Sequence, residues 1–431
     1  MQTRAPDPAI SARDDGRIPV SLLTGFLGAG KTTLLNRLMR HEAMAGTVLL
    51  INEFGEIGID HHLVETLDEQ TVILDSGCLC CTMNGDLIEA LKSLHERMSR
   101  REIPPVRRVV IETTGLADPV PVVNSLMENR HVNVRYVCDG VITVVDATLG
   151  LDQLARHDEA LRQVSIADLL LLGKSDLATR PTRADLTAKL RRLNPSAPVI
   201  ELRNGEIGPD VLFGAGLYAA DRRMRPVGDW LGGAPAPRIE AAHDHHHHGD
   251  HAGDCDHHHG AEAVPPRPHH GDGITSFVLI VDGPLPWRSF AIAMGQLLAR
   301  YGDRLLRVKG LVRALGDEAP VVVQCVRDNA YAPVKLPRWP AEGGFADRRG
   351  RLVFIASGLS AGDEADIRAR LANLPGDTAA VQILARQPNL PTRCWLDARL
   401  PTLHRGAFET AGWVVMPRRF TGAIRATSSG A

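Results

Sequence analysis

The sequence predicts an α/β protein in which a doubly wound, mostly parallel sheet is followed by a smaller α+β domain. From residue 17 to about residue 215, short apolar runs alternate with longer amphipathic stretches, a pattern typical of buried parallel strands separated by helices. A segment rich in histidine, glycine and proline then interrupts the chain at residues 232–273, and apolar runs resume after it. The length of 431 residues is enough for two or three such domains.

Composition narrows the classes of protein to consider. A formal net charge of −2 gives no electrostatic reason to expect a nucleic acid or an anionic membrane as partner. The first twenty residues lack the apolar core of a signal peptide, and no apolar run is long enough to span a membrane. We therefore expect a soluble, cytoplasmic protein, in which clustered cysteines serve as metal ligands or redox groups rather than disulfides.

The elements of the first domain, predicted at residues 17–231 after a polar tail at 1–16, follow the apolar pattern. We expect strands at 18–24, 47–54, 71–75, 107–114, 141–147, 167–176 and 197–202, and helices at 31–41 and 86–98. Residues 232–273 hold 11 of the 18 histidines and have almost no apolar side chains, so they predict a disordered linker.

The second domain is predicted at residues 274–375. Its pattern predicts a strand at 274–286, a helix over 287–314 and strands at 319–326 and 351–357. Residues 376–431 have weaker patterning and form an extension to which the sequence assigns no role.

Residues 25–33, GFLGAGKTT, match the phosphate-loop pattern G-x-x-x-x-G-K-[ST] between a predicted strand and a predicted helix, which makes this a P-loop NTPase fold. Glycines allow backbone N–H groups to approach phosphate oxygens closely, and the helix N-terminus favours an anion. We expect the lysine to neutralise the β- and γ-phosphates and the threonine after it to ligate Mg²⁺. The predicted nucleotide-binding residues of the loop are Gly25, Gly28, Ala29, Gly30, Lys31, Thr32 and Thr33.

Two later strands predict further parts of a nucleotide site. In RRVVIETTGLADP, Glu112 follows an apolar strand and is placed to reach Mg²⁺ or its water, while Gly115 can approach the γ-phosphate. In LLLLGKSDLA, Lys174 and Asp176 have the spacing of the N-K-x-D element that recognises guanine, although Gly173 replaces the asparagine. A carboxylate at Asp176 can accept hydrogen bonds from two N–H groups of guanine, which adenine does not offer.

Three of the seven cysteines lie within four residues, at Cys78, Cys80 and Cys81 in GCLCC. This spacing is too compact for a closed structural zinc site, which usually takes four ligands from two separated knuckles. It predicts an incomplete, exchangeable site, since thiolates favour Zn²⁺ or Cu(I) and an open position admits a ligand from a partner.

The segments TGFLGAGKTTLLNRL, INEFGEIGID, GCLCC and ETTGLADP, in this order and spacing, resemble the CobW-like P-loop GTPases, a metallochaperone family related to the nickel-delivery GTPases. RLLRVKGL and RLVFIAS resemble the second domain of that family, so the resemblance spans about residues 17 to 370. The resemblance implies the same nucleotide-binding roles for the phosphate loop, Glu112, Lys174 and Asp176. It also implies a metal site at the three thiols and a first switch in NEFGE, where Glu53 or Glu56 supplies an oxygen ligand.

The function that the resemblance implies is hydrolysis of GTP with Mg²⁺ coupled to delivery of Zn²⁺, or of Co²⁺ or Ni²⁺, to a client metalloenzyme, with a homodimer among the expected assemblies. The stretch HDHHHHGDHAGDCDHHHG at 243–260 predicts a segment that collects metal ions. Three alternatives stay open: a cobalt chaperone for cobalamin synthesis or a nitrile-hydratase-type activator, a histidine-rich zinc buffer with a vestigial nucleotide site, and a kinase that uses ATP.

Overall fold

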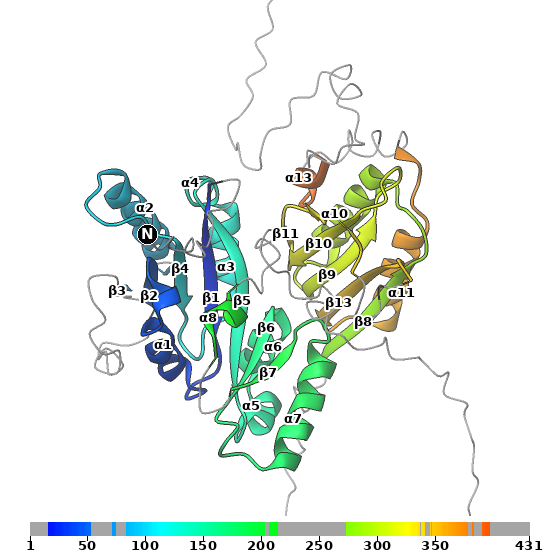
Figure 1. Ribbon diagram of the computed structural model, residues 1–431. Helices are drawn as coiled ribbons and strands as arrows, with labels where there is room; N and C mark the ends of the chain where they lie inside the picture. Colours follow the sequence, from blue (N-terminus) through cyan, green and yellow to red (C-terminus); the bar gives the residue numbers. More distant parts are fainter. Residues whose placement is uncertain are drawn as a thin grey trace, which may run out of the picture.

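A computed structural model of the chain describes residues 16–52, 71–74, 83–202, 207–213, 273–336, 338–340, 345, 347–377, 382 and 390–396. Within these residues the chain forms two sheets with helices packed against them (Figure 1). No helix in the described part is long and apolar enough to cross a membrane.

The first sheet has seven parallel strands in the described residues, in the order β3-β2-β4-β1-β5-β6-β7. The strands are β1 (Ile18–Thr24), β2 (Thr47–Asn52), β3 (Thr71–Leu74), β4 (Arg108–Glu112), β5 (Tyr136–Asp146), β6 (Leu169–Gly173) and β7 (Val199–Glu201). The helical segments are α1 (Lys31–Met39), η1 (Glu42–Met44), α2 (Met83–Ser99), α3 (Val120–Glu128), α4 (Arg130–Asn133), α5 (Gly150–Arg156), α6 (Asp158–Ile166), α7 (Arg180–Leu193) and α8 (Pro209–Leu212). This arrangement confirms the predicted doubly wound parallel sheet.

Helices cover both faces of this sheet because its strands are apolar on both sides. In β6, Leu169 and Leu171 pack in one apolar cluster with side chains of α1, whereas Leu170 and Leu172 pack in another with α6 and α7. Parallel strands place their carboxyl ends at one edge of the sheet, so Thr24 at the end of β1 lies at the same edge as the ends of β4, β5 and β6.

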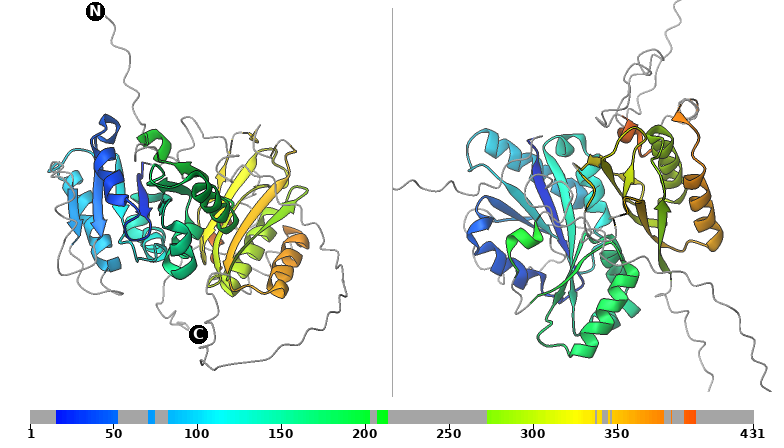
Figure 2. Two further views of the ribbon diagram at one scale, coloured as in Figure 1. Left: turned by 90° about the horizontal axis from the view of Figure 1, so that it is seen from below. Right: turned by 45° about the vertical axis from the view of Figure 1, so that its right-hand side comes forward.

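The second sheet is antiparallel and has the strand order β11-β10-β9-β13-β8 in the described residues, with β12 paired to β10. Its strands are β8 (Ile274–Val281), β9 (Leu305–Arg313), β10 (Pro320–Val326), β11 (Asn329–Ala330), β12 (Val334–Lys335) and β13 (Gly350–Ser357). Three helices of the same domain pack with this sheet (Figure 2): α10 (Trp287–Tyr301), α11 (Ala361–Ala372) and α13 (Arg393–Leu396). The predicted α+β character of this part is confirmed.

One predicted element of this domain is wrong. The helix expected over residues 287–314 ends at Tyr301, and its second half is strand β9, the partner of both β10 and β13. Gly302 follows the helix, and a Cβ at this position would lie 2.4 Å from the carbonyl oxygen of Leu298. Charged residues are uncommon in a buried strand, but Arg307 and Lys309 of β9 are buried in the structure.

The two sheets meet through a buried ionic cluster, defined here as Asp168, Arg307 and Lys309. Asp168 precedes β6, and its Oδ1 accepts from Arg307 and lies 2.7 Å from Lys309 Nζ on β9. Its Oδ2 accepts a hydrogen bond of 2.9 Å from the N–H of Val141. Although burial alone would raise the pKa of Asp168, the two cations lower it, while burial lowers the pKa of Lys309 to about 8.

Residues 390–396 also pack into the second domain. Trp395 is fully buried, stacked 6.0 Å from Trp287 between ring centroids, and its carbonyl oxygen accepts from Trp287 Nε1 at 2.9 Å. The indole of Trp395 donates to the carbonyl oxygen of Tyr331 at 2.6 Å. Part of the predicted extension therefore contributes to the apolar core of this domain.

Candidate functional site

The phosphate loop joins β1 to α1 and takes its shape from glycines. Gly25, Gly28 and Gly30 have φ values of +143°, +72° and +100°, which side chains other than glycine rarely adopt. A Cβ at Gly25 would lie 2.2 Å from the carbonyl oxygen of Val144, whereas a Cβ at Gly28 or Gly30 would meet no described atom within 4 Å. The loop is thus pressed against β5 on one side and open on the other, as a cradle for an anion requires.

Lys31 is the first residue of α1 and is only 8% exposed. Its ammonium folds back over the loop and donates to the carbonyl oxygens of Gly25 at 2.8 Å and Phe26 at 3.5 Å. Ala29 is buried within the loop and Thr33 is exposed on α1. The cation therefore lies across the same loop whose N–H groups are available to phosphate oxygens.

Glu112 and Thr32 come together from neighbouring parts of the sheet edge. Glu112 ends β4, which pairs with β1 so that Glu112 stands opposite Leu23. The hydroxyl of Thr32 donates to Glu112 Oε1 at 3.3 Å. A carboxylate and a hydroxyl together form an oxygen donor set that suits Mg²⁺, so the residues present fit this ion.

The segment after Glu112 contacts the phosphate loop directly. A Cβ at Gly115 would lie 2.5 Å from the backbone nitrogen of Leu27, so glycine is needed for this approach. The hydroxyl of Thr114 is buried and makes no hydrogen bond to any described residue. A buried hydroxyl without a partner beside a phosphate loop is consistent with a ligand that supplies one.

The predicted base-recognition element follows β6 and also reaches the phosphate loop. A Cβ at Gly173 would lie 2.7 Å from the carbonyl oxygen of Ala29, so the absence of an asparagine there allows the two loops to approach closely. Lys174 has a φ of +56° and donates to Asp146 Oδ2 at 2.8 Å. Asp176 is exposed at the end of this element. The structure therefore brings the predicted base-recognition segment and the phosphate loop together at one edge of the sheet.

Asp146 is a residue of this edge that the sequence analysis did not assign. It ends β5, and its side chain is 1% exposed. Burial alone would raise the pKa of its carboxyl, but hydrogen bonds from Lys174, Thr148 and Leu149 outweigh burial and lower this pKa. A carboxylate after an apolar strand is the same signal that identified Glu112, and it was present in VITVVD.

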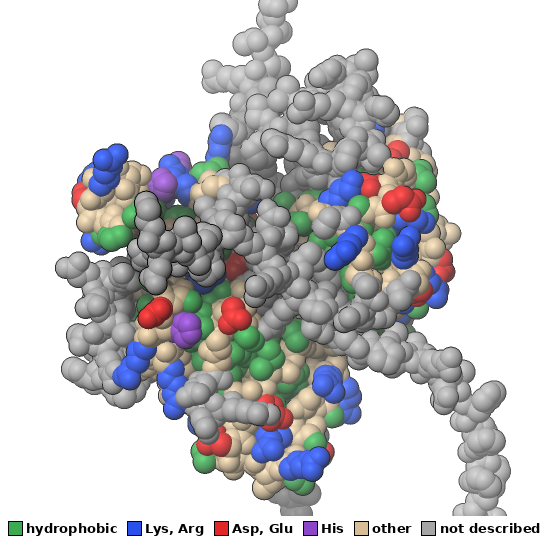
Figure 3. Space-filling model, in the orientation of Figure 1, with side chains coloured by type: hydrophobic (Ala, Val, Ile, Leu, Met, Phe, Trp, Pro, Cys, Tyr) green, Lys and Arg blue, Asp and Glu red, His purple; other side chains and the backbone are tan. Residues whose placement is uncertain are grey.

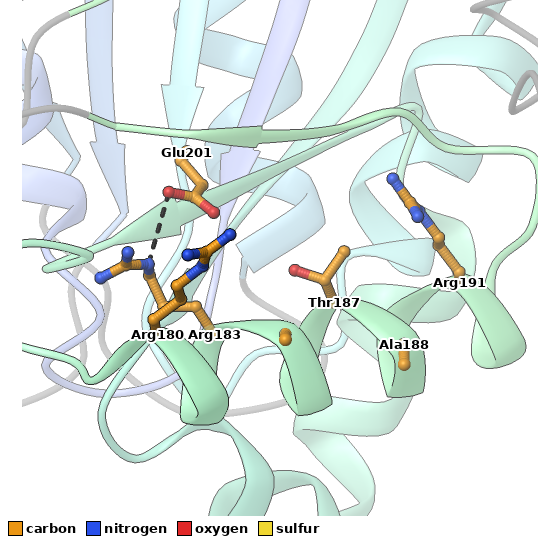
Figure 4. A pocket seen from close by; sticks show the side chains of 7 residues that line it. Arg180, Arg183, Thr187, Ala188, Arg191 and Glu201 are labelled. Atoms are coloured by element: carbon orange, nitrogen blue, oxygen red, sulfur yellow. Dashed lines mark ion pairs between the residues drawn. The ribbon is translucent and has the colours of Figure 1, made fainter.

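Arg183 is a second residue that the sequence did not reveal. From α7 its Nη1 donates to the carbonyl oxygens of Ser175 at 2.8 Å and Ala178 at 2.7 Å. Its Nε lies 3.5 Å from Glu201 Oε2 across a shallow groove of about 380 Å³ (Figure 4). Arg183 therefore holds the loop that carries Asp176, and no sequence pattern marks it, because its partners are backbone atoms.

Charged side chains of both signs lie on the surface around α5 and α7. In the face shown in Figure 3, Lys and Arg side chains lie beside Asp and Glu side chains over the lower end of the molecule, where α5 and α7 are found. Arg156 and Asp152 of α5 form one such exposed pair at 2.7 Å.

The predicted ligands of the delivered metal ion lie outside the described residues. These are Cys78, Cys80, Cys81, Glu53 and Glu56, together with the histidine stretch at 243–260. The described strands β2 and β3 end at Asn52 and Leu74, and β2 is in register with β4 so that Ile51 stands opposite Glu112. Among the residues that the structure describes, no group of three or more His, Cys, Asp or Glu side chains is arranged to hold a metal ion.

Comparison with known proteins gives two family matches. Residues 19–201 match the CobW/HypB/UreG nucleotide-binding domain, and residues 274–374 match the cobalamin synthesis protein cobW C-terminal domain. Zinc chaperone YjiA of Escherichia coli is 31% identical over 357 residues, which cover 83% of this chain and 98% of that protein. Zinc chaperone CobW of a Sinorhizobium species is 29% identical over 400 residues, with 84% and 98% covered.

A relative that matches over part of its length and a solved structure point to the same family. Zinc-regulated GTPase metalloprotein activator 1 of Schizosaccharomyces pombe is 32% identical over 198 residues, which cover 44% of this chain and 47% of the relative. The crystal structure of Zn(II)-bound YjiA GTPase from E. coli superposes with a TM-score of 0.58 and 28% identity, covering 83% of this chain and 99% of that one.

Proposed function

The chain belongs to the CobW/HypB/UreG family, and from this premise we propose that it is a GTP-hydrolysing metallochaperone that binds zinc and transfers it to a client metalloprotein in the cytoplasm. The observation that carries the proposal is the meeting of a phosphate cradle, an acidic strand end and a base-recognition loop at one sheet edge. Relatives named as zinc chaperones support zinc as the cargo.

The residues of the nucleotide site have different roles in GTP hydrolysis. Backbone N–H groups at Gly28 and Gly30 and the ammonium of Lys31 bind the phosphates and stabilise the charge that develops as a water attacks the γ-phosphate. Thr32 and Glu112 would hold Mg²⁺, which supplies neutralisation of phosphate charge when bound. Asp176 would pair with guanine, and Lys174 supports that loop through Asp146.

Zinc would bind to the thiolates of Cys78, Cys80 and Cys81, with an oxygen from Glu53 or Glu56. In sequence these cysteines lie between the two candidate switches, at Asn52 to Asp60 and at Glu112 to Asp118. A segment placed there can be ordered by γ-phosphate contacts and released on hydrolysis, so zinc affinity would depend on the bound nucleotide. By linkage, zinc must change GTP affinity by the same factor.

A zinc titration against a chelator tests this proposal. It uses protein lacking residues 243–260, without nucleotide, with Mg-GDP and with a Mg-bound non-hydrolysable GTP analogue. We expect the zinc Kd to differ by about tenfold between the GDP and GTP states, equivalent to about 1.4 kcal/mol. The double variant Cys80→Ala, Cys81→Ala should abolish the difference.

Other outcomes of this titration select the alternatives. Equal zinc affinity in all three states would remove nucleotide-controlled transfer. Zinc binding that survives the double cysteine variant only when residues 243–260 are present would identify a histidine-rich buffer. Repeating the titration with Co²⁺ and Ni²⁺ tests the cargo, and competition between GTP and ATP tests base recognition.

A further inference from the structure

The turn between β10 and β11 inserts from the second domain into the first. Val326 and Tyr331, which flank this turn, are buried in the apolar cluster that contains Val120 and Val123 of α3. The hydroxyl of Tyr331 lies 3.8 Å from the sulfur of Cys138 on β5. Figure 1 shows β10 and β11 on the side of the second sheet that faces the first domain. The residues that flank the turn are therefore part of the apolar core of the first domain.

The tip of the turn makes two polar contacts with the first domain. Arg327, which has a φ of +50°, donates from Nη2 to Asp118 Oδ2 at 3.3 Å. Asn329 donates to the side-chain oxygen of Asn124 on α3 at 2.8 Å. The side chains of Arg327 and Asp118 are 31% and 23% exposed, so solvent screens this ion pair less than a surface pair.

Asp118 is the last residue of the segment that begins at Glu112 and touches the phosphate loop at Gly115. Four contacts outside the sheet hold this segment. Gly115 packs against Leu27, and the side chain of Gln163 on α6 donates to the carbonyl oxygens of Gly115 at 3.0 Å and Ala117 at 3.1 Å. The third contact is an ion pair between Asp118 Oδ2 and Arg162 Nη1 on α6 at 3.8 Å, and the fourth is the pair of Asp118 with Arg327. Of the four, the pair with Arg327 is the one supplied by the second domain.

We propose that Arg327 is a positioning residue for GTP hydrolysis: it holds Asp118, and through it the segment Glu112–Asp118, in the place where the γ-phosphate is cleaved. This inference rests on the proposed function. The base loop, Lys31 and the glycines bind nucleotide without contact to Arg327, so its loss should affect the hydrolysis step more than binding. Misplacing a group at the reacting centre by even a small distance slows the chemical step.

The test measures single-turnover GTP hydrolysis and the Kd of a fluorescent GTP analogue separately, on the full chain with Mg²⁺. We expect Arg327→Gln to lower the hydrolysis rate about five- to tenfold and to change the Kd less than twofold. Arg327→Lys, which keeps the charge, should restore most of the rate. Arg304→Gln is the matched control, because it removes an ion pair with Asp363 inside the second domain.

A double-mutant cycle with Asp118→Asn identifies the partner, since asparagine keeps an oxygen to accept from the N–H of Val120. In the Asp118→Asn background, Arg327→Gln should have no further effect on the rate. An Arg327→Gln rate equal to that of Arg304→Gln, or an effect that persists in the Asp118→Asn background, overturns the inference.

Hydrogen exchange separates failure of this inference from failure of the proposed function. If the wild-type chain neither binds nor hydrolyses GTP, the proposed function fails. Whether Arg327 holds the segment Glu112–Asp118 in place is then decided by the backbone amides of residues 113–118. Faster exchange there in Arg327→Gln than in wild type and Arg304→Gln supports it, and equal exchange overturns it.

Discussion

The phosphate loop and the ionic cluster between the domains are held in place by opposite means. The loop depends on backbone conformations that only glycine adopts easily, with Gly25 against Val144 and Gly115 against Leu27. The cluster depends on charged side chains of Asp168, Arg307 and Lys309, buried together. A backbone conformation that requires glycine can be recognised in the sequence by the glycine itself. The burial of a charged residue cannot be recognised until its partner is known.

The largest expected effect lies in the ionic cluster. Asp168→Asn keeps an acceptor for the N–H of Val141 but removes the carboxylate that the buried Arg307 and Lys309 share. Removing one partner of a buried pair costs about 3–5 kcal/mol, so we expect the free energy of unfolding in urea to fall by this amount. The control Asp152→Asn breaks the exposed pair with Arg156 and should cost less than about 1 kcal/mol. Equal losses would mean that the cluster contributes no more than a surface pair.

The phosphate loop should respond next, through nucleotide binding rather than stability alone. Gly25→Ala places a methyl group 2.2 Å from the Val144 carbonyl oxygen, so the loop must move. We expect the affinity for a fluorescent GDP analogue to fall by about a hundredfold or more, equivalent to about 2.7 kcal/mol. Gly283→Ala is the control, because a Cβ there meets no described atom within 4 Å. Unchanged affinity in Gly25→Ala would place the nucleotide site elsewhere.

The pH dependence of stability gives a smaller and more specific test of the cluster. Burial lowers the pKa of Lys309 from 10.5 to about 8, so between pH 8 and 10.5 the unfolded chain binds more protons than the folded one. The contribution of Lys309 to the free energy of unfolding should therefore rise with pH across this window, by about 2 kcal/mol. Urea unfolding from pH 8 to 10.5 measures it against Lys309→Met, which has no proton to lose. Parallel curves for the two proteins would contradict the lowered pKa.

The smallest effect is expected at Arg183, which joins a charged side chain to a loop of the nucleotide site. Arg183→Gln removes the charge beside Glu201 and weakens the support of the carbonyl oxygens of Ser175 and Ala178. We expect GTP affinity to fall about three- to fivefold, about 1 kcal/mol or slightly less, with hydrolysis of bound GTP unchanged. Arg191→Gln, at the far end of the same groove, is the control. A rate effect without an affinity effect would assign Arg183 to a different step.

The same contrast explains how much the sequence predicted. The parallel sheet was predictable because its strands are continuous apolar runs, and the phosphate loop because glycine, lysine and threonine occur at fixed spacing. Strand β9 was missed because LLRVKGLVR carries charges that usually face solvent. Arg307 of this strand is buried because it pairs with Asp168, which lies 139 residues earlier in the chain.

Within the candidate site, the residues that could be predicted are again those with a recognisable sequence pattern. Glu112 was found because it ends an apolar strand beside the phosphate loop, and Asp146 carries the same signal. Gln163 and Arg183 could not be found, because their partners are carbonyl oxygens, which every residue has. Gly173 was a departure from the guanine-binding pattern in the sequence, and in the structure it allows contact with Ala29.

The packing of Trp395 gives the second domain a natural optical reporter. Its indole is stacked on Trp287 and bonded to the backbone of Tyr331, which flanks the turn that carries Arg327. Indole emission responds to the polarity and hydrogen bonding of its surroundings, so a displacement of this turn would change the fluorescence of the unlabelled chain. Emission recorded during a single turnover, with Trp395→Phe as the blank, would show in real time whether the second domain follows events at the first.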